Sequence, residues 1–583
     1  MKNFTRILAL LLCVVLLAFA FASCGKDKNK DASATTTAAK TGDSSAKSTT
    51  TATPATTTVN VWPSIAEEID EFESVNKNFK IVLDMYTSSE RIAKNQQYIQ
   101  GPDEIEEGVT SAIEQLVYER NRDAKELLDV TVDYDYWNDK DLHKWGQQSK
   151  QIIQVVQGHA VDAPDLFVAM VYDMNLALLT QGVFKDFISA PGTYFNFESD
   201  GWMTSWMESL SFTGDRAYIL GSDYFVDIVR AMGVLPFNKD LMDENSVKLA
   251  TAILPEGETL SDGETLSERF FDYVEMGNWT WDTLGKLCQA IWVDTDGNEQ
   301  SSIGDTLGII TDKYSGMPAA LMFFSTGEIL TTTTPVEDGM GNDTGRVQIN
   351  LPADSTVIGS IFDAVKSVFG GQGAFVTSDS TSSGNSIDQP GIAYHYTKFA
   401  ENTLLFAGPC LISALESEQF QQMESVYSVV PLPKVSADKK YNTIIHNTSD
   451  AGAINVNTNP QRVRTMSAYL QYCTERSPEI REEFLQIVMK YKNTVYDQGT
   501  DRMLNLIYAN ITNARDKAIE DAAEKTSSDR YHGAMKDHGF TWGSSDVVSW
   551  YEGVKSSKQS KVDTVISTWY TLPTSETAPA DAE

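Results

Sequence analysis

Aromatic residues stand beside carboxylates and amides at several places where an apolar run of the sequence stops. Trp and Tyr rings cover apolar C–H faces, and Asp, Asn and Ser side chains hydrogen-bond to fixed hydroxyls. Together these residue types suit a ligand such as a sugar, which offers both kinds of surface. In chain order the candidate ligand-binding residues are Trp62, Trp137, Tyr172, Asp173, Ser222, Asp223, Tyr224, Asn447 and Asp450.

Most of these residues also have a structural interpretation. Trp62 is either a stacking platform or a core ring beneath the first helix. The stretch "YDYWNDKD" (134–141), which contains Trp137, supplies either cleft residues or one core aromatic with a helix N-cap. Asp223 could equally accept a hydrogen bond from a backbone N–H, and the same alternative holds for the "HNTSD" stretch (446–450).

The first half of the chain after residue 58 alternates between strand and helix patterns. The predicted strands are 58–62, 79–86, 130–137 and 165–171, and the predicted helices are 65–75, 105–128, 141–158 and 174–182. This alternation indicates βαβ units and a mostly parallel sheet. Such sheets bind ligands at the carboxyl ends of their strands, which is where the candidate residues fall.

The second half continues in the same style. Patterns predict a strand running into a helix over 234–244, helices over 278–292 and 356–371, strands over 426–433 and 451–456, and mainly helices from 461. Thr280 is a suitable N-cap for its helix. A tryptophan at a helix start usually packs onto the sheet, so we expect Trp279 and Trp281 to be structural.

The N-terminus resembles the signal and lipobox of a bacterial lipoprotein. Lys2 and Arg6 precede the apolar run 7–21, which is short for a membrane span and suits a signal peptide. Two small residues then lead to Cys24, with Phe three places before it where that family prefers Leu. The resemblance implies lipid on Cys24, each buried CH₂ adding about 0.8 kcal/mol of membrane affinity. An ordinary signal peptide cut two residues earlier is the alternative. Residues 24–58 contain no aromatic side chain and predict a flexible tether.

Charge and cysteine content exclude several classes of protein. The 583-residue chain has a formal net charge of −35, and loss of Lys2 and Arg6 with the signal peptide changes it to −37. A chain this acidic does not bind nucleic acid through its phosphates. Cys288, Cys410 and Cys473 show no metal-binding spacing, so we expect buried thiols, with one disulfide as the alternative. About 525 residues follow the tether, too many for one small core, which predicts two or more lobes.

Four segments occur in a characteristic order. They are "DAPDLFVAMVYDMNLALLTQGVFKDF" (162–187), "GDRAYILGSDYFVDIVRAMGVLPFNKDL" (214–241), "NWTWDTL" (278–284) with "DTDGN" and "GDTLGI" after it, and "FAENTLLFAGP" (399–409) with "YSVVPLPK" after it. In order and spacing they resemble the extracellular, family 1-like solute-binding lipoproteins of carbohydrate ABC transporters. The resemblance covers roughly residues 60–475.

This resemblance implies an α/β, two-lobed, periplasmic-binding-protein-like fold of class II. Each lobe would be a mostly parallel sheet flanked by helices, and segments 214–236 and 434–453 resemble the strands that cross between lobes. The implied parts are a signal peptide (1–23), a disordered Thr/Ser/Ala-rich tether (24–58), an N-terminal lobe (59–221 with about 446–535), a C-terminal lobe (222–445 with about 536–573) and a disordered tail (574–583).

The resemblance also implies a function without catalysis. A sugar or oligosaccharide would be captured between the lobes and delivered to a membrane permease and its ATPase. The protein would be a monomer without cofactor or metal, held by lipid at the outer face of the cytoplasmic membrane. Tyr172 and Asp173 fall where the family places cleft residues, which favours ligand contact there. Cys410 stands near a position where relatives often carry an aromatic ring.

Two other functions stay open at this point: a lipid-anchored glycoside hydrolase, and a receptor for peptides or another solute on the same fold. The 81 acidic residues make carboxylate pairs uninformative, and no GxSxG or HExxH motif is present. The loop "DTDGNEQSSIGD" (294–305) resembles a calcium loop, but its Gly is fourth rather than sixth, so an acidic surface turn is expected.

Overall fold

The computed structural model describes residues 60–84, 96–137, 145–160, 162–188, 190–313, 316–377, 394–490, 497–524 and 529–574. The described residues from 61 onward form one compact unit. The predicted signal peptide, the tether and Cys24 lie outside the described residues. Among the residues described, none of the helices combines the length and the apolar character needed to cross a membrane.

The first sheet has four strands in the order β12-β3-β1-β2. They are β1 (Asn78–Asp84), β2 (Thr131–Trp137), β3 (Leu166–Met170) and β12 (Asp450–Ile454). Strand β1 pairs in parallel with β2 and β3, whereas β12 returns from late in the chain and pairs antiparallel with β3. All five residues of β3 are buried, as expected for a central strand that helices cover on both faces.

Helices cover this sheet, and their starts follow from local sequence. They are α2 (Trp62–Asp70), α4 (Ala112–Leu128), α5 (Gln147–Gln157), α6 (Val171–Gln181), α7 (Thr204–Leu210) and α17 (Pro460–Glu475). Ser111 and Glu114 form a capping box that begins α4. The predicted strand over 58–62 is wrong at its end: Trp62 is the first residue of α2, because Pro63 suits the first turn of a helix.

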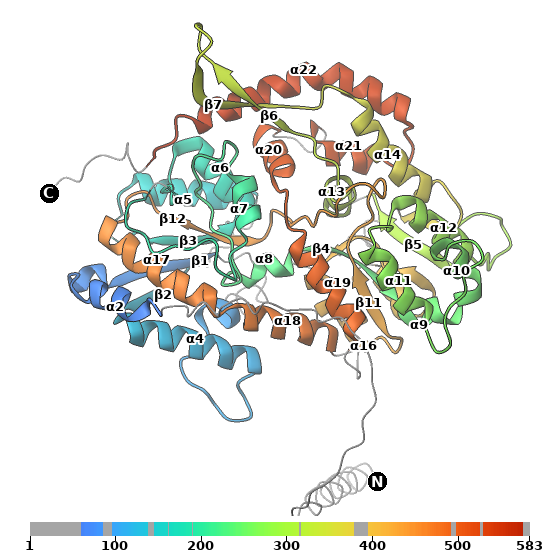
Figure 1. Cartoon of the computed structure of the whole chain (residues 1–583), viewed down its shortest axis with the longest axis horizontal. Helices are drawn as coiled ribbons and strands as arrows, with labels where there is room; N and C mark the ends of the chain where they lie inside the picture. The colour runs from blue at the N-terminus through green and yellow to red at the C-terminus, as the bar shows by residue number, and fades with distance from the viewer. Residues whose placement is uncertain are drawn as a thin grey trace, which may run out of the picture. The chain divides into compact units, whose positions relative to one another are not determined.

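The second sheet contains β10-β4-β9-β5-β8, with β11 also paired to β4. Its strands are β4 (Gly233–Asn238), β5 (Leu307–Asp312), β8 (Ala374–Thr377), β9 (Leu404–Phe406), β10 (Cys410–Leu411) and β11 (Tyr427–Val430). Strand β5 pairs in parallel with β8 and β9, and β4 pairs antiparallel with β9. In each sheet the three parallel strands lie in the order second, first, third, and a strand that follows a crossing, β12 or β4, pairs antiparallel with the third. The two-lobed α/β prediction is confirmed (Figure 1).

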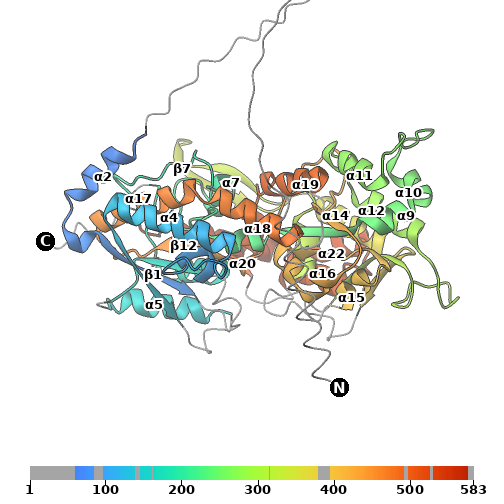
Figure 2. The ribbon, with the colours of Figure 1, turned by 90° about the horizontal axis from the view of Figure 1, so that it is seen from below.

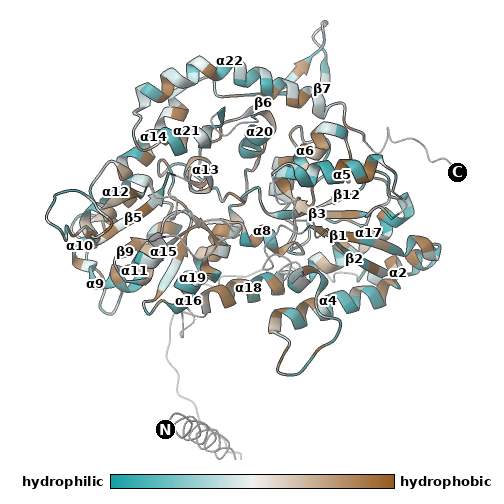
Figure 3. Ribbon diagram, turned by 180° about the vertical axis from the view of Figure 1, so that it is seen from behind, coloured by the Kyte–Doolittle hydropathy of each residue, from teal (hydrophilic) through white to brown (hydrophobic). Residues whose placement is uncertain are grey.

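Helices also flank the second sheet. They are α9 (Lys239–Glu244), α10 (Ser246–Ile253), α11 (Leu266–Glu275), α12 (Trp281–Ile291), α13 (Gly316–Phe324), α14 (Thr356–Phe369), α15 (Tyr394–Ala400) and α16 (Glu418–Gln422). Thr280 accepts the N–H of Thr283 and caps α12, as predicted. Figure 3 shows the strands of both sheets in hydrophobic colours, while the surrounding helices alternate between hydrophobic and hydrophilic residues.

Two chain segments that connect the sheets run side by side. The first includes α8 (Val226–Arg230) and leads into β4, and the second leads into β12. Antiparallel bridges join Leu220 to Gly452 and Met232 to Ile445. The N–H of His446 donates to the carbonyl of Ala231 at 2.9 Å. The two crossings are thus hydrogen-bonded to each other over much of their length.

The C-terminal helices make further contacts with both sets of elements. They are α18 (Pro478–Lys490), α19 (Gln498–Ala509), α20 (Arg515–Ala523), α21 (Tyr531–His538) and α22 (Ser544–Trp569). Helix α18 contacts α4, and α19 packs on α11 and β11 (Figure 2). Helix α22 packs on α14. The ring of Trp569, the last residue of α22, lies against that of Phe212, with 4.7 Å between the ring centroids. A separate hairpin of β6 (Thr332–Glu337) and β7 (Asp343–Asn350) also touches α22.

Candidate ligand-binding site

The carboxyl ends of β2 and β3 hold two of the predicted aromatic residues. Trp137 is the last residue of β2, half-buried, with its ring edge-on to Phe167 at 5.7 Å. Tyr172 lies just beyond β3, in the first turn of α6. Strand periodicity predicted these places, because parallel strands end at a common edge.

Tyr172 is the centre of a group of side chains from distant parts of the chain. The ring of Trp145 meets it edge-on at 4.8 Å, and the guanidinium of Arg530 lies 5.7 Å from its ring centroid. Its backbone N–H donates to the carbonyl of Asn447 at 3.0 Å, which ties β3 to the second crossing. Trp145 is 49% exposed, so this ring is free to cover the apolar face of a ligand.

The charged part of the group comes from α20 and from Arg530, the residue just before α21. Asp521 accepts hydrogen bonds from Asn447 and from Lys517, the latter at 2.5 Å. Arg530 forms an ion pair with the other oxygen of Asp521 at 3.2 Å. The side chains of Lys517 and Asp521 are only 6% and 5% exposed, so this pairing is made largely out of water. We call Trp145, Tyr172, Asn447, Lys517, Asp521 and Arg530 the Tyr172 cluster.

A small cavity lies against the Tyr172 cluster. Its lining includes Trp206, His446, Asn447, Ser449 and Lys517, and its volume is about 20 Å³, room for roughly one water molecule. The hydroxyl of Ser449 is fully buried there and has no hydrogen-bond partner among the described residues. A sugar could therefore enter only if the surrounding elements moved apart.

Asp173 faces away from this cavity in spite of its position next to Tyr172. Its Oδ1 accepts the backbone N–H of Ser149 in the first turn of α5, at 2.9 Å. The residue is fully buried, and burial raises the pKa of its carboxyl. The side chain thus caps a helix, which is the kind of structural role that aspartate takes at helix starts.

The predicted crossing residues Ser222, Asp223 and Tyr224 are all fully buried. The Oδ2 of Asp223 accepts from Arg481 on α18 at 2.7 Å, and its Oδ1 accepts from the hydroxyl of Tyr508 on α19 at 2.9 Å. Burial raises the pKa of Asp223 to about 6, although the neighbouring guanidinium opposes the rise. In this conformation both carboxylate oxygens of Asp223 are hydrogen-bonded within the protein. Asp223 thereby joins the first crossing to the C-terminal helices.

Ser222 and Tyr224 have internal partners as well. The hydroxyl of Ser222 accepts from that of Thr474 at 3.1 Å. The guanidinium of Arg120 lies over the ring of Tyr224, 4.7 Å from its centroid. Both contacts hold the first crossing against helices of the first sheet.

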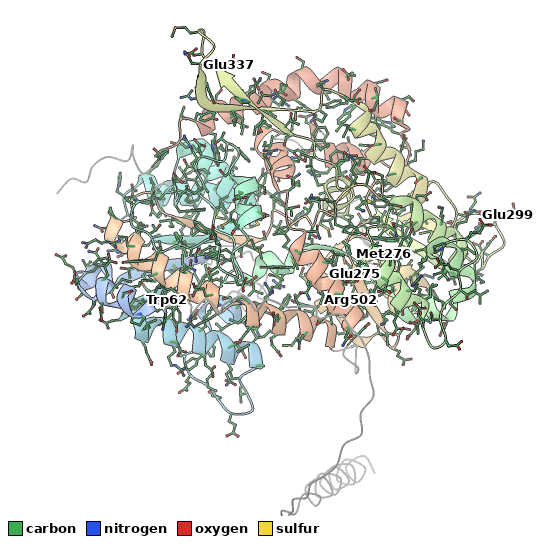
Figure 4. The ribbon with its side chains drawn as sticks, in the orientation of Figure 1. Trp62, Glu275, Met276, Glu299, Glu337 and Arg502 are labelled. Carbon is green, nitrogen blue, oxygen red and sulfur yellow. The ribbon has the colours of Figure 1, made fainter. Side chains whose placement is uncertain are left out.

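Trp62 and Asp450 also sit within the protein. Trp62, labelled in Figure 4, is 8% exposed. Its ring is edge-on to that of Tyr472, with 4.9 Å between the ring centroids, and its Nε1 donates to Glu475. This is the core position among the two interpretations of Trp62. Asp450 is buried, and its backbone N–H donates to Asp227 at 2.9 Å. Of the predicted residues, the structure therefore brings Tyr172 and Asn447 together.

Sequence reasoning missed four members of the Tyr172 cluster: Trp145, Lys517, Asp521 and Arg530. Trp145 fell inside a helix predicted over 141–158, whereas α5 begins only at Gln147, after Gly146 with φ 79°. That glycine was the available signal. The charged residues of α20 are surface-like in sequence, and only the packing shows that they are buried.

Other expectations concern tryptophans and thiols. Trp279 and Trp281 are 0% and 1% exposed, which confirms their structural role. Cys288, Cys410 and Cys473 are free and buried, as expected.

The loop over 294–305 brings three carboxylates together. Atoms of Asp294, Asp296 and Asp305 lie within 4.8 Å of one another. Asp294 accepts the backbone N–H groups of Gly297 and Glu299, and these hydrogen bonds lower the pKa of its carboxyl. Asp305 is buried and likewise accepts N–H groups of its own loop. These hydrogen bonds explain the loop as an acidic turn.

A larger groove lies elsewhere. About 540 Å³ in volume, it follows the edge strand β8 and includes Lys313, Phe369, Phe375 and Phe540 in its lining. The lining of this groove includes none of the residues that the sequence predicted as ligand-binding.

Comparison with known proteins gives no matching family model and no matching curated protein. Three solved structures illustrate the similarities of fold. A family 1 extracellular solute-binding protein from Bifidobacterium longum subsp. infantis is 14% identical, with 85% of this chain and 99% of that chain covered and a TM-score of 0.43. The galacto-N-biose-/lacto-N-biose I-binding protein of the ABC transporter from Bifidobacterium longum is 11% identical (85% and 98%, TM-score 0.43). The GacH receptor of Streptomyces glaucescens GLA.O is 11% identical (85% and 98%, TM-score 0.40). At these values the likeness concerns the fold alone.

Proposed function

We propose that this protein is the substrate-binding component of an ABC importer and captures a sugar or oligosaccharide between its two lobes. One observation carries the proposal: two sheets of the same strand order are joined by two hydrogen-bonded crossings, and the Tyr172 cluster lies where the second crossing meets the first sheet. Rings, an amide and charged groups from separate elements converge there, as binding a hydroxylated solute requires.

The mechanism in this proposal is closure about the crossings. A ligand would enter between separated lobes, stack on Trp145 and Tyr172, and hydrogen-bond to Asn447. Contacts to both lobes would then favour the closed form, since a ligand shifts an equilibrium by its difference in affinity for the two states. The closed form would deliver the solute, chemically unchanged, to the membrane permease and through it to the ATPase.

Lipid on Cys24 would hold the protein at the outer face of the cytoplasmic membrane. The tether of residues 24–58 would let the lobes reach the permease. The protein would act as a monomer, and its net charge of −35 leaves nucleic acid out as a partner.

Calorimetry with panels of neutral and acidic oligosaccharides tests the proposal. We expect binding without turnover, and at least tenfold weaker binding by Trp145→Ala, because a lost stacking contact of about 1.4 kcal/mol corresponds to that factor. Met340→Ala is the matched control, since Met340 is 86% exposed on the separate hairpin. Chromatography of the incubated sugars must show no products. Hydrolysis products would favour the glycoside hydrolase, and binding of peptides but no sugar would favour the peptide receptor.

A further inference from the structure

We infer that the solute bound at the Tyr172 cluster carries an acidic group, as a uronic acid sugar does, and that Lys517 and Arg530 bind that group. The inference rests on the proposed function, because it places the acidic group on the captured sugar. Four observations carry it: the local charge, the unused donors of Lys517, the unused donors of Arg530, and the partners of the nearby acids.

The charge of the Tyr172 cluster is opposite to that of the chain. The chain has 46 basic and 81 acidic residues, yet the cluster contains two cations and one carboxylate. One positive charge is therefore left without a matching negative one inside the cluster. A buried cation without a full counter-charge is costly, so such a surplus suits an anion that arrives with the ligand.

Lys517 has donors to spare. Its ammonium carries three N–H groups, and among the described residues it has a single hydrogen-bond partner, Asp521. The side chain is 6% exposed and lines the cavity beside Tyr172, so water satisfies little of the remainder. Ser449, whose buried hydroxyl is also unpartnered among the described residues, lines the same cavity.

Arg530 has a free side as well. Its Nε donates to the carbonyl of Glu524 at 3.1 Å, and its Nη1 pairs with Asp521. Its Nη2 donates to no described residue, while the guanidinium lies 5.7 Å from the ring centroid of Tyr172. A sugar on that ring would thus bring a carboxylate within reach of a guanidinium edge, a pairing that Arg makes well.

The remaining acids around α20 have their own partners. Glu520 accepts from His532 at 2.6 Å, and Glu524 pairs with Lys558 at 3.0 Å and with Lys561. Asp516 accepts the N–H of Leu330 at 2.8 Å.

Asp173, next to Tyr172 in the chain, is turned into the start of α5. Glu520 also attracts Lys517 electrostatically, but among the described residues none of these carboxylates forms a hydrogen bond or an ion pair with either cation of the cluster. The unused donors of Lys517 and Arg530 are therefore not taken up by these carboxylates, and the guanidinium of Arg530 lies beside the ring of Tyr172.

Matched ligands test this inference on the full chain. Calorimetry would compare oligogalacturonate, oligomannuronate and chondroitin disaccharides with the same sugars after reduction of their carboxyls to alcohols. We expect an acidic sugar to bind and its reduced form to bind at least tenfold more weakly. Raising the salt concentration should weaken only the acidic ligand, because salt screens the charge interaction.

Two variants assign the effect to residues. Lys517→Met and Arg530→Gln should each weaken binding of the acidic sugar at least tenfold. Each variant leaves Asp521 one cation, so we expect the fold to be retained. Lys286→Met and Arg122→Gln, which alter exposed ion pairs elsewhere, are the controls and should change nothing. Circular dichroism checks that each variant is folded.

The outcomes separate the two proposals. If neutral sugars bind as tightly as acidic ones, or if the two variants bind the acidic sugar normally, the inference is overturned and the solute-binding function stands. If no sugar of either kind binds, the proposed function fails and the inference fails with it.

Discussion

At the scale of single residues, Asp223 joins the first crossing to two C-terminal helices, because Arg481 donates to its Oδ2 at 2.7 Å and Tyr508 to its Oδ1 at 2.9 Å. Strand periodicity correctly placed Trp137 and Tyr172 at strand ends. It did not show that Asp223 would be buried, because its partners Arg481 and Tyr508 lie more than 250 residues away in sequence. The direction in which a side chain points depends on such distant partners. The aromatic residues at the strand ends could therefore be predicted from the sequence, whereas the charged residues of the Tyr172 cluster could not.

Asp223 gives a prediction about pH. Burial raises its pKa from 3.8 to about 6, so the folded state binds this proton more tightly than the unfolded state. The stabilisation is complete below pH 4 and is lost as the pH rises through 6. A shift of about two pKa units corresponds to about 3 kcal/mol. The free energy of unfolding of the native protein minus that of Asp223→Asn should therefore fall by up to that amount between pH 4 and pH 6.5.

Urea unfolding of both proteins at several pH values measures this difference. Above pH 7 the difference should be flat, because Asp223 is then ionised in both states. A difference that rises with pH over the same window would mean that Arg481 governs the carboxyl instead of burial, and would contradict the prediction.

At the scale of elements, the predicted order of strands and helices agrees well with the structure. Boundaries failed where a local rule was overlooked, as at Pro63, which starts α2 where a strand was expected. The role of α20 could not be predicted, because a helix with charges on several faces reads as solvent-exposed. Its buried charges make sense only with α21, α22 and the second crossing packed around it.

The start of α4 allows a test at this scale. The hydroxyl of Ser111 accepts the N–H of Glu114, and the carboxylate of Glu114 accepts the N–H of Ser111 at 2.8 Å. Ser111→Ala removes one half of this capping box and should lower the free energy of unfolding by about 1 kcal/mol. Urea unfolding measures it. Ser360→Ala, at an exposed interior position of α14, is the control and should leave stability unchanged or slightly higher. Equal losses in both variants would contradict the capping role.

At the scale of the whole molecule, the shared strand order of the two sheets matters more than any single contact. The first crossing leads into β4 of the second sheet, and the second crossing leads into β12 of the first sheet. Each crossing is therefore fixed where it enters a sheet. A change in relative orientation would therefore be concentrated between these points. Buried thiols make such a change measurable: burial raises the pKa of Cys410 to about 12 and of Cys473 to about 11, so few thiolates compete for a label.

Spin labels on the two lobes should report closure. With Cys13 and Cys24 replaced by serine, cysteines would be introduced at Val109 and Val247, which are 74% and 90% exposed. Val109 lies just before α4, which packs on α17 of the first lobe, and Val247 lies in α10, which packs on α12 of the second. Electron–electron double resonance should give a shorter and narrower distance distribution once a bound sugar contacts both lobes, because the ligand selects the closed state. A control pair at Val247 in α10 and Met276 at the end of α11, two helices that pack on each other, should show one distance with or without sugar. If calorimetry shows saturation while the distance between the lobes stays the same, the solute binds without closure, and the crossings do not act as a hinge.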